Sequence, residues 1–392
     1  MNTPIAGLAG AAHASRLGAH RRRRLSRSLM LAGLVLAFSV TALPASAANW
    51  WSATPSVSIG SQTIDVRKAG ATGDGVHDDT SAFQAAINSL PSSGGTITVP
   101  AGRYMIDALR SINMRSHVRL QMSSGAQLVA IPNDRTRSYV IKVSRVTDVE
   151  ISGGEIIGER ARHIGSTGEW GMGIGILASN NVTVRDLKVS DCWGDGLYIG
   201  AIGSAGSAVS STGVTINNVI STNNRRQGLS IGPVDRVYVV NSTFSNTNGT
   251  KPEAGIDIEP MTQGISKNVR IEGSTISGNA GSGVELQANV TGVVIKSSTV
   301  KGNNGFGIYG NGVTNAWFAN NLITENGLDG VALTSPTRDV KVTSNRVTYN
   351  STRWFVANNK SIYTLTSSER DLQIPSSLIN ITVTGNTLSP AP

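Results

Sequence analysis

Cysteine is almost absent from this chain, since Cys192 is the only one among 392 residues. A single cysteine excludes an intramolecular disulfide and a metal site built from several thiolates. Histidine is also scarce, and only His77, His117 and His163 follow residue 47. Beyond that residue no apolar run is long enough to span a membrane. We therefore expect packing and backbone hydrogen bonds to hold the fold together.

The first 47 residues have the composition of an export signal rather than of a folded domain. Four consecutive arginines at 21–24 precede an apolar run over 28–43, and Ala45-Ser46-Ala47 supplies the small residues of a cleavage site. We expect cleavage to leave a secreted or periplasmic protein that starts at Ala48 and has no membrane association.

The signal also accounts for most of the positive charge. The whole chain carries 34 basic and 25 acidic residues, a net charge of +9. Six of the arginines and no acidic residue lie in 1–47, so the remainder has 28 basic and 25 acidic residues and a net charge of +3. Such a small excess gives no argument for a nucleic-acid partner, and we expect none.

A short phrase recurs seven times along the chain: a glycine, an apolar residue, a variable residue and usually a second apolar residue. The steps between its glycines are 23, 32, 27, 28, 24 and 23 residues. Repeats of this length are typical of stacked architectures. The phrase begins at Gly173, Gly196, Gly228, Gly255, Gly283, Gly307 and Gly330.

The segments between the phrases contain short alternating β-branched strands separated by polar bends, as in 267–279 and 291–304. No long helical pattern separates them, which excludes βαβ units. The spacing therefore predicts a parallel β-helix with three short sheets. Asparagines at the bends are expected to tolerate left-handed backbone and to hydrogen-bond along the stack.

The N-terminal part carries a more specific pattern. Helical spacing predicts a capping helix at about 79–90, and Asp74, Asp78 and Asp79 are expected to serve turns and the helix cap. The strings GATGDGVHDDTSAFQAAI and GGTITVPAGRY resemble the first coil of the pectin-lyase-like right-handed β-helix superfamily, in its rhamnogalacturonase- and epimerase-like branch.

This resemblance implies an all-β, single-stranded right-handed parallel β-helix, a three-sheet solenoid with a short N-terminal capping helix. We expect a leader at 48–61 and one catalytic domain at 62–392. The resemblance also implies a polysaccharide substrate, which we expect to be acidic and to contain uronate. A monomer is expected.

Strand parity selects the candidate catalytic residues. The variable residue of the phrase points out of the coil, because its apolar neighbours point inward. By the same parity, the glycines of the phrase lie on this outer face two residues earlier. The outward column is Gly175, Tyr198, Ser230, Asp257, Glu285, Tyr309 and Ala332. Three carboxylates, Asp257, Glu259 and Glu285, then converge on adjacent rungs. At that distance we expect one to keep a proton or a cation to bridge them.

Further residues are expected to bind substrate around these acids. Long insertions at 201–212, 249–253 and 261–267 are expected to form the walls of a cleft. A glycine-rich loop at 158–176 adds arginine and tryptophan, which suit acidic sugars. The candidate substrate-binding residues are Tyr198, Arg226, Tyr309, Gln287, Arg162, His163, Glu169, Trp170 and Asp195.

The chemistry is open at this point. Hydrolysis needs a protonated carboxyl and a second carboxylate, which the three acids can provide without any cofactor. A lyase would instead use Asp257, Glu259 and Glu285 to hold Ca²⁺, and the pattern is also compatible with a C5-epimerase or a non-catalytic adhesin. The strings Asn-Thr-Asp, Gly-His-Gly and Asp-Pro-His-Glu of relatives in the superfamily are absent. We expect a glycoside hydrolase, because acids dominate the centre.

Overall fold

The computed structural model describes residues 56–362 and 368–389. The chain divides into two units, 1–45 and 46–392, and only the second contains described residues. The expected signal and the first part of the leader lie outside the described residues, so these boundaries remain predictions. Within the described part of the chain, no helix is long and apolar enough to cross a membrane.

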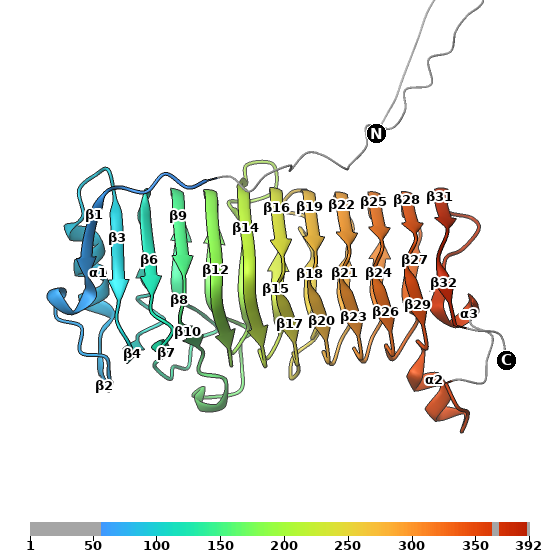
Figure 1. Ribbon diagram of the computed structural model, residues 1–392, viewed down its shortest axis with the longest axis horizontal. Helices are drawn as coiled ribbons and strands as arrows, with labels where there is room; N and C mark the ends of the chain where they lie inside the picture. The colour runs from blue at the N-terminus through green and yellow to red at the C-terminus, as the bar shows by residue number, and fades with distance from the viewer. Residues whose placement is uncertain (1–55, 363–367, 390–392) are drawn as a thin grey trace, which may run out of the picture. The chain divides into compact units, whose positions relative to one another are not determined.

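The described residues form a parallel β-helix in which each coil except the first and the last contributes one strand to each of three ladders (Figure 1). In one coil, β18 (Ile256–Ile258) is followed by β19 (Ser266–Glu272) and β20 (Thr275–Ser277). These pair in parallel with β21 (Val284–Leu286), β22 (Val290–Lys296) and β23 (Thr299–Lys301) of the next coil. The predicted three-sheet solenoid is confirmed.

We number the ladders by the order of their strands within this coil. Ladder one also contains β5 (Ile112–Asn113), β8 (Arg137–Ser144), β11 (Trp170–Leu177), β13 (Asp195–Ile202), β15 (Gln227–Ile231), β24 (Ile308–Asn311), β27 (Val331–Thr334) and β30 (Leu372–Gln373). Ladder two also contains β1 (Gln62–Asp65), β3 (Gly95–Val99), β6 (Val118–Met122), β9 (Thr147–Ser152), β12 (Asn180–Ser190), β14 (Val209–Thr222), β16 (Val234–Val240), β25 (Thr314–Ala319), β28 (Arg338–Thr343) and β31 (Ile379–Thr384).

Ladder three also contains β2 (Asp74–Asp78), β4 (Gly102–Ile106), β7 (Ala126–Ala130), β10 (Glu155–Ile157), β17 (Thr243–Ser245), β26 (Leu322–Thr324), β29 (Arg346–Thr348) and β32 (Thr387–Leu388), together with the last residues of β12 and β14. The described helices are η1 (Val66–Ala69), α1 (Thr80–Ser89), η2 (Arg160–Arg162), α2 (Thr352–Ala357) and α3 (Ser368–Asp371).

The coil interior holds an apolar core and hydrogen-bonded asparagines. The apolar residues of the glycine phrase, such as Ile256 and Ile258, are fully buried. Burying one such side chain contributes about 1.5–3 kcal/mol. At one bend, Asn303 Nδ2 donates to Asn326 Oδ1 at 2.9 Å, and Asn326 Nδ2 donates to Asn350 Oδ1 at 2.9 Å. The predicted hydrogen bonding of asparagines along the stack is therefore confirmed.

The glycines of the phrase do not lie where strand parity predicted. A Cβ added at Gly283 would lie 2.4 Å from Val300 Cγ1 and 2.7 Å from the carbonyl oxygen of Gly307. Such a Cβ would enter the coil, because the chain bends just before β21 and parity does not extend back through the bend. Glycine is required here by close approach and not by an exposed position.

The capping helix is confirmed as α1, which buries Phe83, Ala86 and Ile87. Asp79 stands at its N-cap position, but its side chain makes no cap hydrogen bond and instead accepts from the Thr72 amide at 2.7 Å. The Asp78 carboxylate accepts from the Thr80 amide at 3.0 Å. These aspartates therefore hold the turn and the start of the helix, as expected.

Candidate active site

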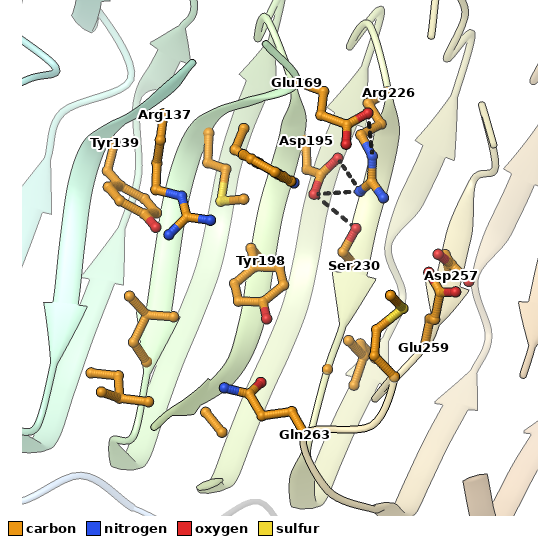
Figure 2. A pocket seen from close by; sticks show the side chains of 18 of the residues that line it. Arg137, Tyr139, Glu169, Asp195, Tyr198, Arg226, Ser230, Asp257, Glu259 and Gln263 are labelled. Atoms are coloured by element: carbon orange, nitrogen blue, oxygen red, sulfur yellow. Dashed lines mark hydrogen bonds and ion pairs between the residues drawn. The ribbon is translucent and has the colours of Figure 1, made fainter. Parts of the chain in front are cut away.

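A groove of about 490 Å³ runs across the outer face of ladder one, over β8, β11, β13, β15 and β18 (Figure 2). The register confirms the predicted outward column, since Tyr198 pairs with Ser230, Ser230 with Asp257, and Asp257 with Glu285. The groove is lined by the acids Glu169, Asp195, Asp257 and Glu259, the bases Arg137 and Arg226, the aromatics Tyr139, Trp170 and Tyr198, and by Ser230 and Gln263 among others.

Asp257 is the most strongly perturbed acid of the groove. It is 2% exposed, and Gln227 Nε2 donates to its Oδ2 at 2.6 Å. Burial raises the pKa of Asp257 to about 8, the Gln227 hydrogen bond opposes the rise, and Glu285 and Glu259 add to it. Its buried Oδ1 has no hydrogen-bond partner among the described residues. Asp257 therefore keeps its proton at neutral pH.

Asp195 is buried as well, but it has a cationic partner. Arg226 Nη1 lies 3.2 Å from its Oδ1 and 3.3 Å from its Oδ2, and Ser230 Oγ donates to Oδ2 at 2.8 Å. Burial raises the pKa of Asp195 to about 6, and the Arg226 charge limits the rise. Figure 2 shows Arg226 between Asp195 and Glu169, whose Oε2 lies 3.7 Å from Arg226 Nε. Asp195 is therefore mostly ionised at pH 7.

Aromatic side chains line the part of the groove nearer the N-terminus. A Cβ added at Gly175 would lie 2.5 Å from Tyr139 Cδ1, and one added at Gly200 would lie 2.5 Å from Tyr198 Oη. Small residues at these outward positions therefore leave space for the two rings. Burial raises the pKa of Tyr139 and of Tyr198, so both phenols remain hydrogen-bond donors at neutral pH.

Two of the predicted insertions form a wall of the groove. The insertion after β13 folds back as a hairpin in which Ile202 pairs with Val209 of β14 in antiparallel register. Gln263, from the loop after β18, donates from Nε2 to the Gly203 carbonyl at 2.7 Å and joins the two insertions. Met261 from the same loop also lines the groove. The insertion at 249–253 does not line it.

Three predicted site residues lie on later rungs of ladder one and outside this groove. Glu285 pairs with Tyr309 on the strands after β18, and Tyr309 stacks on Phe306 with ring centroids 5.0 Å apart. Gln287 Oε1 accepts from Asn311 Nδ2 at 3.4 Å. Strand parity grouped these three residues with Asp257 and Glu259, because parity does not indicate where the walls of the groove end. Glu285 still acts on Asp257 through its charge.

His163 and Arg162 also lie outside the groove. The His163 side chain is 1% exposed, and its Nδ1 lies 2.9 Å from Glu159 Oε2. Its ring stacks on Trp193 at 3.9 Å, and the Arg225 guanidinium lies 3.7 Å from the centre of the Trp193 ring. Arg162 donates to the Ala130 carbonyl at 3.0 Å. These side chains hold the loop that presents Glu169 and Trp170, so a direct contact with substrate in the groove is not supported.

Arg137, Tyr139 and Gln227 were not predicted from the sequence, although they belong to the site. The first two lie on β8, one rung before the first glycine phrase, where the repeat that identified the outward column has no copy. The alternation in RSYVIKVS was the available signal. Gln227 immediately precedes the third phrase and contacts Asp257 only because of the register between β15 and β18.

The lyase alternative would place Ca²⁺ on Asp257, Glu259 and Glu285. Among residues 56–362 and 368–389, no group of three or more His, Cys, Asp or Glu side chains is placed to hold a metal ion. Asp257, Glu259 and Glu285 therefore do not form a ready calcium site. Whether the reaction needs a cofactor stays a prediction.

Comparisons with known proteins agree with this architecture. The family model described as right handed beta helix region matches residues 128–260 and 254–389. The model described as rhamnogalacturonase A/epimerase, pectate lyase-like matches residues 63–149. The second match covers the strings that carried the resemblance in the sequence.

Individual proteins and a solved structure are also similar to this chain. The protein YclG of Bacillus subtilis is 31% identical over 257 residues, which cover 58% of this chain and 44% of YclG. An Arabidopsis thaliana exopolygalacturonase, clone GBGA483, is 26% identical over 218 residues, or 54% of this chain and 42% of the relative. The chain thus spans less than half the length of these relatives. The A-module of the Azotobacter vinelandii mannuronan C-5 epimerase AlgE6 superposes with a TM-score of 0.64 and 17% identity over 84% of this chain and 100% of the module, a likeness of fold.

Proposed function

Since the chain belongs to the right-handed parallel β-helix family, with the N-terminal coils of its rhamnogalacturonase A/epimerase branch, we propose that it hydrolyses glycosidic bonds of a polysaccharide in the groove of ladder one. One observation carries the proposal. Two carboxyl groups of the groove have pKa values moved to about 8 and about 6. At neutral pH such a pair offers one acid and one base.

Asp257 is the proposed general acid. It is protonated at pH 7, and Gln227 occupies its Oδ2 as a hydrogen-bond donor. The proton is therefore expected on Oδ1, the oxygen that has no partner among the described residues. In the proposal this proton passes to the glycosidic oxygen as the bond to the leaving sugar breaks, which requires the bound sugar to reach an oxygen that is buried in the free protein. Gln227 acts as a positioning residue in this scheme.

Asp195 is the proposed general base. Arg226 keeps it ionised, and Ser230 links it to the strand that pairs with β18. Ser230 Oγ donates to Asp195 at 2.8 Å and is in register with Asp257 on the neighbouring strand, so Ser230 lies between the two carboxyl groups. Inverting hydrolysis needs about 6.5–9.5 Å between acid and base, enough for the water that Asp195 would deprotonate as this water attacks the anomeric carbon. Glu259 is left to bind sugar hydroxyls beside Asp257.

Elimination next to a uronate, or epimerisation, is the second candidate, and the arginines and tyrosines of the groove favour it. An arginine would neutralise the uronate carboxylate, and a tyrosine would take the proton. The electrostatics oppose this chemistry, because burial raises the pKa of both tyrosines and Asp195 helps to raise that of Arg226. None of these groups is thereby prepared to act as a base near neutral pH.

A polysaccharide panel, acidic and neutral, incubated with and without a chelator, tests the proposal. We expect new reducing ends without the ultraviolet absorbance of an unsaturated uronate, and no effect of the chelator. Ultraviolet absorbance would show that the reaction is elimination and not hydrolysis. A change in the NMR spectrum of the polymer without cleavage would indicate epimerisation. Binding of a polymer without any change in it would indicate an adhesin or scaffold. Export through residues 1–47 and a monomeric state remain part of the proposal.

A further inference from the structure

The two arginines of the groove differ in what they contact. Arg226 is held by Asp195 at 3.2 Å and lies 3.7 Å from Glu169. The Arg137 side chain makes no hydrogen bond or ion pair with any described residue, and its guanidinium carbon lies 4.9 Å from the centre of the Trp170 ring. The positive charge of Arg226 is therefore used within the protein, whereas that of Arg137 is available to a ligand.

The surroundings of Arg137 suit a sugar ring. Trp170 is 37% exposed, and Tyr139 continues the aromatic surface on the same strand as Arg137. An aromatic face packs against the apolar face of a pyranose, and a guanidinium binds a carboxylate through two parallel hydrogen bonds. Figure 2 shows Arg137 and Tyr139 at one end of the groove and Asp257 and Glu259 at the other.

The spacing along ladder one sets the distance between this surface and the acids. β8, which carries Arg137, is followed by β11, β13 and β15, and Ser230 on β15 lies between Asp195 and Asp257. Three strand spacings correspond to roughly 14 Å. This spacing is between backbones, and Figure 2 shows Arg137 at the opposite end of the groove from Asp257, so an anionic group bound by Arg137 lies away from the broken bond.

We propose that Arg137, Trp170 and Tyr139 form a subsite for a carboxylate-bearing sugar, remote from the site of cleavage, which selects polymers with a negative charge at that distance. The subsite rests on the proposed function for its role in cleavage, but its binding of anionic sugar is independent of any turnover. It deepens that function by making the acidic sugar a requirement at one position of the bound chain.

Binding measured in an Asp257→Asn background tests the subsite without turnover. Isothermal titration calorimetry would compare oligomers of galacturonate and of mannuronate with the same oligomers after reduction of their carboxyl groups. We expect Arg137→Gln to weaken binding of at least one acidic series by about 10- to 100-fold, the effect of losing a hydrogen-bonded charge. Binding of the reduced oligomers should change less than about twofold.

Arg135→Gln is the matched control, because it removes the same charge two residues earlier from an exposed arginine paired with Asp134 at 3.3 Å. It should leave binding of both series unchanged. Equal losses for acidic and reduced oligomers, or failure of both acidic series to bind at millimolar concentration, would overturn the subsite. Tighter binding of sulfated neutral oligomers than of either uronate series would overturn the carboxylate assignment. If uronates bind through Arg137 but no polymer is cleaved, the subsite stands and the proposed hydrolysis fails.

Discussion

The two ends of the groove come from the same repeat but differ in chemistry. Toward the N-terminus, Arg137, Tyr139 and Trp170 give a cationic and aromatic surface. Toward the C-terminus, Asp257 and Glu259 give a carboxylate surface with a raised pKa at Asp257. The inward positions are alike at both ends, because they must pack in the same core. Under the proposed function, the outward positions that lie between the walls of the groove decide whether a rung binds the polymer or takes part in its cleavage.

The largest expected effect lies at the carboxylate end. Asp257→Asn removes the proposed proton donor while keeping its shape, so kcat should fall by about 10²–10⁴-fold with little change in KM. Steady-state kinetics on the cleaved polymer would measure this. The control is Asp235→Asn on ladder two, which removes a carboxylate that lies 3.7 Å from Lys267. A fall in kcat of less than about threefold for Asp257→Asn would remove Asp257 from the mechanism.

The same substitution, which lowers activity, should raise the stability of the fold at alkaline pH. The folded pKa of Asp257, about 8, lies above the unfolded value of about 3.9, so its contribution to stability is complete below about pH 4 and is lost as pH rises through about 8. Asp257→Asn should therefore raise Tm relative to wild type at pH 9, by about 2–4 °C for each kcal/mol, and much less at pH 4. Thermal unfolding at both pH values measures the difference, and an equal Tm shift at both would contradict it.

The pH profile of kcat/KM should be a bell with limbs set by Asp195 near 6 and Asp257 near 8. Two variants should move the alkaline limb in opposite directions. Glu285→Gln removes a charge that raises the pKa of Asp257, so the limb should move to lower pH. Gln227→Leu removes a hydrogen bond that lowers this pKa, so the limb should move to higher pH. Shifts in the same direction would disprove the assignment of this limb.

A smaller effect is expected at the aromatic end. Trp170→Ala should raise KM by about 2- to 10-fold through lost stacking and leave kcat within about twofold. Trp317→Ala, on β25 of ladder two, is the control and should leave KM unchanged. If Trp170→Ala lowers kcat rather than raising KM, the two ends of the groove are not separate in function.

The smallest effect is expected on the rungs beyond the groove. Tyr309→Phe should change kcat and KM by less than about twofold, because β24 lies two rungs after the last strand that lines the groove. Initial rates over a range of substrate concentrations would detect a larger effect. A rise in KM comparable with that of Trp170→Ala would mean that the bound polymer extends over Glu285 and Tyr309.

The fold and the outward column were predictable because they depend on local periodicity. A period of 23–32 residues with alternating apolar residues specifies a coil, and parity then places Tyr198, Ser230, Asp257 and Glu285 on one line. Strand parity wrongly placed the glycines of the phrase on the outer face, because the chain bends there. Parity also could not distinguish Asp257, which lies between the walls of the groove, from Tyr309, which occupies the same column beyond those walls.

The coil, the capping helix and the line of outward residues follow from the pattern of neighbouring side chains along the chain. Which of those residues act together depends instead on how successive coils stack. Arg226 meets Asp195 and Gln227 meets Asp257 across rungs, from positions about 30 residues apart, and Gln263 joins hairpin 201–210 in one wall of the groove. The pKa values of the two acids follow from that burial and pairing, which exist only when successive coils are stacked.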